Sequence, residues 1–122
     1  MAYEIKFSIP YLPPVGMNQR GHWSKAHKET RLVDSLVAAA VCGRKPEKPL
    51  QKIKLFLQRH SSVCPDYDGL VHSFKNVVDA LVTCGILVND RMENTGAWQV
   101  EWRKAPPKGG FIVVHVVEHA EE

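Results

Sequence analysis

Apolar residues along the chain recur with two different spacings, which separate predicted strands from predicted helices. Residues 3–9 and 51–60 alternate apolar and polar positions, as strands do when they bury one face. After Ser24, a candidate N-cap, apolar residues recur every three or four positions as far as Val41. Gly43 can end this helix, so we expect a strand, a helix and a strand in that order.

The second half of the chain shows the same two spacings. Residues 68–84 carry an apolar stripe at helical spacing, and Gly85 is placed to end that helix. Residues 98–103 alternate, and the valine-rich residues 111–118 predict a last strand after a turn at 106–110. We expect these last two strands to form an antiparallel hairpin.

The order of these elements predicts the fold class. Strand, helix, strand, helix, strand, strand is typical of an α+β protein. We expect two layers, with two helices packed on one face of a mixed sheet. Neither a repeat nor an internal boundary divides the 122 residues, so we expect a single domain over residues 1–122.

Composition excludes several classes of protein. Hydrophobic residues make up 44% of the chain, but no apolar run approaches the roughly 20 residues that span a bilayer. The first residues lack the apolar stretch of a secretory signal. The three cysteines, Cys42, Cys64 and Cys84, have neither a disulfide pattern nor zinc-ligand spacing. We therefore expect a cytoplasmic protein without a membrane span, a disulfide framework or structural zinc.

The net charge of +3 is modest, but the basic residues gather in one part of the chain. Residues 17–60 contain ten Lys and Arg residues and only three acidic ones. Such a basic stretch suits a polyanionic partner, because neutralising phosphates favours nucleic-acid binding. Charge alone, however, favours the simpler interpretation of a lysine-rich protein surface.

The segment 65–90 carries the candidate chemistry. Asp66 and Asp68 lie where the second helix should begin, and free backbone N–H groups favour carboxylates there. Four polar residues then share one helical stripe opposite the apolar one: Asp68, His72, Lys75 and Asp79. An N-cap acid followed by a solvated face with Asp–Lys pairs explains the same pattern, so both interpretations stay open.

Asp90 supplies a third carboxylate. The apolar stretch before it can turn the chain back along the helix, toward Asp66 and Asp68. Three carboxylates can hold Mg²⁺, a hard cation that prefers oxygen ligands. Such a metal activates water and stabilises charge on a phosphodiester, while Lys75 can neutralise a phosphate oxygen or help to transfer a proton. The segment therefore predicts phosphodiester hydrolysis.

These residues resemble the motif of the RusA family of Holliday junction resolvases. That motif is an Asp-x-Asp pair, a helix with Lys four residues before Asp-Ala-Leu, a Gly-apolar stretch and a final acidic pair. The matching positions here are Asp66, Asp68, Lys75, 79–81, 85–87 and 89–90. Near the N-terminus, the prolines at 13 and 14 followed by Asn18 match a second family element, so the resemblance spans nearly the whole chain.

The resemblance implies an activity and a partner. The catalytic residues would be Asp66, Asp68, Asp90 and Lys75, and the three aspartates would hold Mg²⁺, with Mn²⁺ as a substitute. A homodimer would present two such sites to a four-way DNA junction and nick symmetry-related strands. This would serve recombination and repair in a bacterial or phage-infected cell. The candidate DNA contacts are Asn18, Arg20, His22, Lys25, Lys28 and, on the acidic face, His72.

Two alternatives remain open beside junction resolution. A nuclease of the same fold could act on replication forks or flaps, which the sequence does not distinguish from four-way junctions. A binding module that holds branched DNA without cutting it is supported by two departures from the family motif. Gly69 stands where the family usually has Asn, and Asn89 where it usually has Asp.

Trp98 and Trp102 share one strand face and are most simply assigned to the core or an interface.

Overall fold

The computed structural model describes residues 3–12 and 23–119, with the backbone alone for 23–27. Its elements are β1 (Glu4–Ile9), α1 (Trp23–Val41), β2 (Ile53–Ser61), α2 (Tyr67–Ser73), α3 (Lys75–Thr83), α4 (Met92–Thr95), β3 (Gln99–Lys104) and β4 (Phe111–Glu118). No helix among the described residues is both long and apolar enough to cross a membrane.

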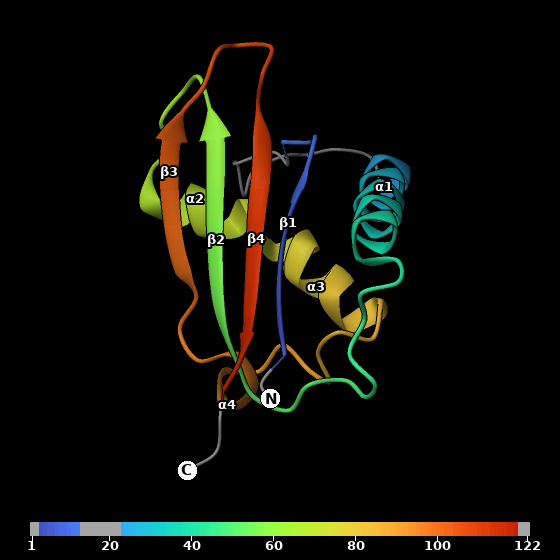
Figure 1. The fold of residues 1–122 in the computed structure, drawn as a ribbon. Helices are drawn as coiled ribbons and strands as arrows, with labels where there is room; N and C mark the ends of the chain where they lie inside the picture. Colours follow the sequence, from blue (N-terminus) through green and yellow to red (C-terminus); the bar gives the residue numbers. More distant parts are fainter. Residues whose placement is uncertain (1–2, 13–22, 120–122) are drawn as a thin grey trace.

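The four strands form one mixed sheet in the order β1-β4-β2-β3 (Figure 1). β4 pairs antiparallel with β1 and with β2, whereas β2 and β3 are parallel. Helices α2 and α3 cross behind the sheet in Figure 1, and α1 packs against α3 and β1. The predicted α+β class, with helices packed on a mixed sheet, is confirmed.

The predicted hairpin between the last two strands is wrong. β3 pairs with β2, from Phe56 opposite Gln99 to Ser61 opposite Lys104, and β4 lies on the other side of β2. The connection between them passes over the end of β2 (Figure 1). The side chains explain this arrangement, because the apolar β4 suits a central position and the charged β3 suits an edge.

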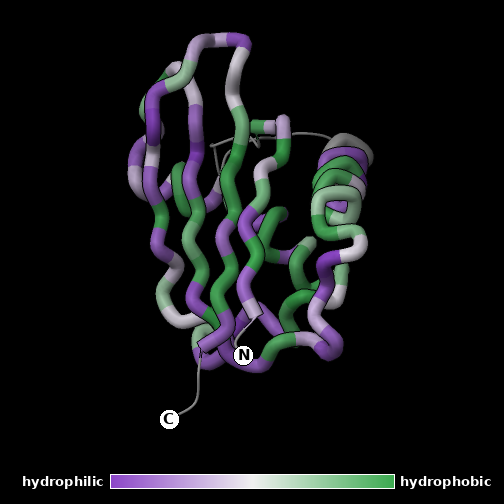
Figure 2. The backbone as a smooth tube through the Cα atoms, viewed as in Figure 1, coloured by the Kyte–Doolittle hydropathy of each residue, from purple (hydrophilic) through white to green (hydrophobic). Residues whose placement is uncertain are grey.

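The core lies between the sheet and the helices. Alternate residues of β1, β2 and β4 are buried, and Figure 2 shows hydrophobic and hydrophilic positions alternating along these strands. Val33, Val37 and Val41 of α1 are fully buried on the facing side, as the helical spacing predicted. α1 begins at Trp23, so Ser24 lies inside the helix and not at its cap.

The single helix predicted over residues 68–84 is two helices. α2 and α3 meet at Phe74, which is fully buried and lies at φ −92°, ψ −5°. The buried Ser73 hydroxyl donates to the Leu70 carbonyl (2.7 Å), a local bond that bends helices. The apolar stripe is nevertheless buried as expected, and Lys75 becomes the first residue of the second helix.

Candidate functional site

The two aspartates at the start of α2 have different surroundings. Asp66 is the N-cap, and its Oδ1 accepts a hydrogen bond from the backbone N–H of Gly69 at 2.8 Å. This is the structural role that the helix-start pattern allows. Asp68 lies two residues further along, in the first turn of α2, and its side chain is exposed. Asp66 is therefore held in place by the helix backbone, whereas Asp68 faces solvent.

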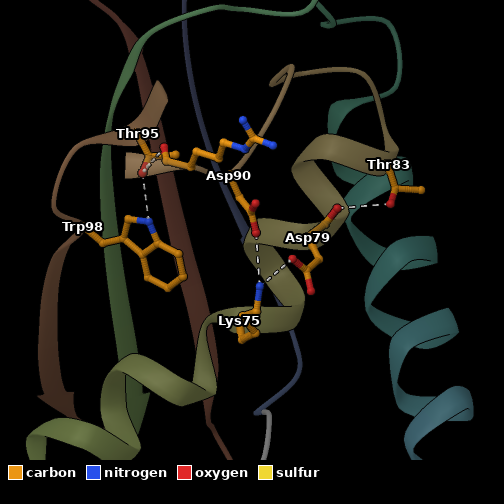
Figure 3. Close-up of polar contacts among 7 residues, drawn as sticks. Lys75, Asp79, Thr83, Asp90, Thr95 and Trp98 are labelled. Atoms are coloured by element: carbon orange, nitrogen blue, oxygen red, sulfur yellow. Dashed lines mark hydrogen bonds and ion pairs between the residues drawn. The ribbon is translucent and has the colours of Figure 1, made fainter. Parts of the chain in front are cut away.

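Lys75 joins two acidic side chains at the start of α3. Its Nζ donates to Asp79 Oδ1 and to Asp90 Oδ2, each at 3.1 Å (Figure 3). These hydrogen bonds, first to Asp79 and then to Asp90, raise the pKa of Lys75 above its ordinary value. The bond from Lys75 also lowers the pKa of Asp90. Both groups therefore stay charged at neutral pH, which makes Lys75 a fixed cation and not a proton acceptor.

The fold around Gly85 explains how Asp90 reaches Lys75. Gly85 has φ +82° at the end of α3, a conformation that glycine adopts readily. The N–H groups of Gly85 and Ile86 bond back to the carbonyls of Val82 and Leu81, the pattern of a Schellman cap. Leu50 then pairs with this segment, donating to Ile86 O at 2.8 Å and accepting from Val88 N at 3.0 Å. The chain consequently turns back along α3 and brings Asp90 to Lys75, whereas the sequence predicted that Asp90 would approach Asp66 and Asp68.

A cavity of about 420 Å³ opens beside this cluster. Its lining residues are Tyr67, Asp68, Val71, His72, Lys75 and Trp98. Three of the polar residues predicted to share a helical stripe therefore do share a surface, despite the break at Phe74. The two aromatic residues were not predicted to belong to the site. Trp98 and Trp102 fall on the same face of an alternating stretch, and this spacing predicted a core position for Trp98. Tyr67 lies between two aspartates at a helix start, and this position in the sequence could have indicated a place in the site.

The segment after Asp90 fixes the Trp98 ring. The indole Nε1 of Trp98 donates to Thr95 Oγ1 at 3.2 Å, and the buried Thr95 hydroxyl donates to Gly96 O at 2.8 Å. Asn94 Nδ2 donates to Gln51 O at 2.7 Å and so ties the same segment to the chain before β2. In Figure 3 the indole extends into the space beside Lys75 and Asp90. The aromatic wall of the cavity is thus held by its own hydrogen bonds.

The donor chemistry of the predicted metal ligands suits Mg²⁺, because Asp66, Asp68 and Asp90 all offer carboxylate oxygens. Lys75 is the residue common to Asp90 and Asp68 in the structure. Its Nζ donates a hydrogen bond to Asp90, and its side chain lines the same cavity as Asp68. In the part of the chain that the structure describes, no group of three or more His, Cys, Asp or Glu side chains is gathered closely enough to hold a metal ion.

The predicted DNA contacts fall in several places. Asn18, Arg20 and His22 lie outside the described residues, and the side chain of Lys25 does too. Lys28 is exposed on α1, and His72 is exposed on α2, where it lines the cavity. His72 is therefore the predicted DNA contact that the structure brings to the candidate catalytic residues.

A second, larger hollow of about 1060 Å³ lies at the start of β2. It is lined by Lys52, Ile53, Lys54, Leu55, Phe56, Met92, Glu93, Asn94, Thr95, Gly96, Ala97, Gln99 and His119. Residues 92–99 thus border both hollows, since Trp98 lines the smaller one.

Comparison with known proteins leaves the family open. The chain matches no protein-family model, and no curated protein matches its sequence. The resemblance to RusA resolvases therefore remains a prediction from the motif residues.

Proposed function

We propose that this protein is a Mg²⁺-dependent endonuclease that cuts four-way DNA junctions. The observation that carries the proposal is the position of Lys75. It forms an ion pair with Asp90 and lines one cavity with Asp68, so residues that are far apart in the motif meet at one surface. A solvated helix face with Asp–Lys pairs would account for the bond to Asp79, but not for the bond to Asp90 from another segment.

The three aspartates Asp66, Asp68 and Asp90 would hold the metal, for which their carboxylates would have to move closer together than they lie in the structure. The metal would supply an activated water and stabilise negative charge on the phosphodiester. Lys75 holds the Asp90 carboxylate in one position and keeps it ionised, so no proton has to leave that group before it binds a cation. The ammonium also places a positive charge where a phosphate oxygen would lie. Asp66 is oriented by the backbone N–H of Gly69.

The proposal includes a homodimer that acts in recombination and repair within the cytoplasm of a bacterial or phage-infected cell. Paired nicks require two equivalent sites, and a two-fold symmetric dimer supplies them to a junction with the same symmetry. The basic residues of the chain would position the DNA through its phosphates and would not read its sequence.

The first experiment is incubation of the purified protein with a labelled four-way junction, a fork, a flap and linear duplex, with Mg²⁺ and with EDTA. We expect paired, symmetric nicks in the junction that need Mg²⁺ and are absent from the duplex. Cleavage of forks or flaps in preference to junctions would show that the protein is a nuclease for those branched structures and not a junction resolvase. Tight junction binding without cleavage in either Mg²⁺ or Mn²⁺ would overturn the nuclease proposal in favour of a binding module.

The matching variants are Asp66→Asn, Asp68→Asn and Asp90→Asn. Asn caps helices about as well as Asp, so Asp66→Asn removes the charge and keeps the cap of α2. We expect each variant to lose cleavage while binding the junction at least as tightly as the wild type, because repulsion between carboxylates and phosphates falls. Normal cleavage by Asp68→Asn or Asp90→Asn would contradict the site assignment.

A further inference from the structure

The smaller cavity has an aromatic lining that phosphodiester hydrolysis does not require. Tyr67, His72 and Trp98 present three rings, and Val71 adds an apolar surface between them. Tyr67 is 69% exposed, so most of its ring is accessible to a ligand. Rings exposed beside a charged cluster are typical of surfaces on which a planar ligand stacks.

The two aromatic walls differ in how firmly they are held. Trp98 is half-buried, and its indole is fixed by the hydrogen bond to Thr95. Tyr67 begins α2 and projects into solvent, so its ring can adjust to a ligand lying against Trp98. A rigid wall and an adjustable one together suit a flat group that enters from outside.

Polar groups border the same cavity and suit the edge of a nucleobase. The Asp68 carboxylate accepts hydrogen bonds, as exocyclic amino groups require, and Lys75 donates them. His72 offers either role, depending on its tautomer. The rings therefore suit the faces of a base, and the polar side chains suit its edge.

We propose that this cavity binds one unpaired nucleobase of a branched DNA, stacked against Trp98 and covered by Tyr67. The proposal rests on the proposed function for its ligand class. The volume of about 420 Å³ is sufficient for a small molecule but not for a base pair within a duplex. A base must leave its stack to enter, and this costs least at a branch point, where pairing is already interrupted. The cavity would therefore favour branched DNA over duplex.

The test is a thermodynamic cycle between the protein and the DNA, measured as binding in EDTA so that no cleavage occurs. The probes are a four-way junction and the same junction carrying a single abasic residue at each position next to the branch point in turn. The proteins are the wild type, Tyr67→Ala, Tyr67→Phe and Tyr67→Leu. Phe56→Leu is the matched control, because Phe56 is an exposed aromatic residue (37%) that lines the other hollow.

At one position we expect the wild type to lose about tenfold in affinity when the base is removed. Tyr67→Ala should lose a similar factor on the intact junction and nothing further on the abasic one, because both changes remove the same stacking contact. Tyr67→Phe should restore the response to the base, Tyr67→Leu should not, and Phe56→Leu should behave as the wild type.

A merely structural role for Tyr67 would lower binding of every probe equally and leave the abasic penalty unchanged. Independent effects of the base and of Tyr67 at every branch position would therefore overturn the proposal, even for a protein that cleaves junctions normally. A coupled cycle in a protein that never cleaves would overturn the nuclease activity and leave the base pocket standing. Failure to bind any of the DNA probes would overturn both.

Discussion

The two hollows that border residues 92–99 differ in how their polar groups are held. In the larger one, Lys52 and Lys54 lie at the start of β2, and its walls are joined by backbone and amide bonds, from His119 N to Lys52 O and from Asn94 to Gln51 O. In the smaller one, Lys75 is bonded to two carboxylates from different segments, and the Trp98 ring is fixed by Thr95.

This difference shows that volume alone is a poor guide to a candidate site. The larger hollow has more than twice the volume, at about 1060 Å³ against about 420 Å³. Lys75, which lines the smaller one, forms an ion pair with Asp90 in which each group shifts the pKa of the other, a feature typical of functional sites. These groups are also held in place before any ligand binds, which lowers the entropy cost of binding and catalysis.

The largest expected effect is a difference in cleavage rate between variants of Lys75 in the smaller hollow and Lys52 in the larger one. We expect Lys75→Met to lower junction cleavage by at least about 100-fold, because it removes both the cation and the group that positions Asp90. Lys52→Met should lower cleavage by at most about tenfold, through one lost phosphate contact. The measurement is the single-turnover cleavage rate at two salt concentrations.

Salt distinguishes the causes of these two losses. Attraction to phosphates is screened by salt, so the defect of Lys52→Met should grow when the salt concentration is lowered and shrink when it is raised. The defect of Lys75→Met should persist, because the group is needed at the reacting centre. Equal losses in the two variants, or a Lys75→Met loss that shrinks at high salt as the Lys52→Met loss should, would show that the smaller hollow is not the catalytic one.

A smaller effect concerns the two glycines that end α1 and α3. Gly43 has φ +77° and Gly85 has φ +82°, and an added Cβ would meet no atom within 4 Å at either position. Each change to Ala should therefore cost about 1–2 kcal/mol of stability, from backbone strain alone. Denaturant unfolding should show the two losses to be similar.

Cleavage should distinguish these matched variants. Gly85 directs the chain toward Asp90, whereas Gly43 ends α1, which carries none of the three side chains of the Lys75 cluster. At a temperature where both variants are folded, we expect Gly85→Ala to cleave more slowly than Gly43→Ala. Identical rates would mean that Asp90 reaches its position independently of the α3 cap.

The sequence predicted the fold class and the region of the site, and the errors have physical causes. Alternation and helical spacing located the strands and helices, because burial of one face dominates both patterns. The pairing of β3 was predicted wrongly. β3 and β4 are neighbours in the sequence, which favours a hairpin, but in the sheet β2 lies between them. The break at Phe74 was missed because the apolar stripe continues through it.

The site was predicted less completely than the fold. The approach of Asp90 to the helix followed from a glycine and an apolar stretch, whose local geometry is readable in the sequence. The aromatic wall of the cavity could not be predicted in the same way. Trp98 has the spacing of a core residue, and its place in the cavity wall depends on the hydrogen bond to Thr95, which the sequence does not reveal. Asp66 is the N-cap of α2, as the interpretation of this pattern as a helix start and a solvated face predicted. Its proposed metal binding stays a prediction.

The smallest expected effect tests the charge states within the Lys75 cluster. The pKa of Asp90 is lowered from its usual 3.8, so its ion pair stabilises the fold above that pH and is lost as the pH falls through the lowered value. The pKa of Lys75 is raised from its usual 10.5, so its contribution is complete below that pH and is lost as the pH rises through the raised value.

The stability lost in Asp90→Asn should consequently be constant between about pH 5 and about pH 9. It should amount to at most about 1 kcal/mol, because Lys75 and Asp90 are 54% and 33% exposed and solvent screens the pair. The measurement is the difference in unfolding free energy between wild type and variant across this range, with Leu32→Ala, at an exposed apolar residue, as a control that removes no charge. A cost that changes within the range would show that a further group titrates with the cluster and sets its charge.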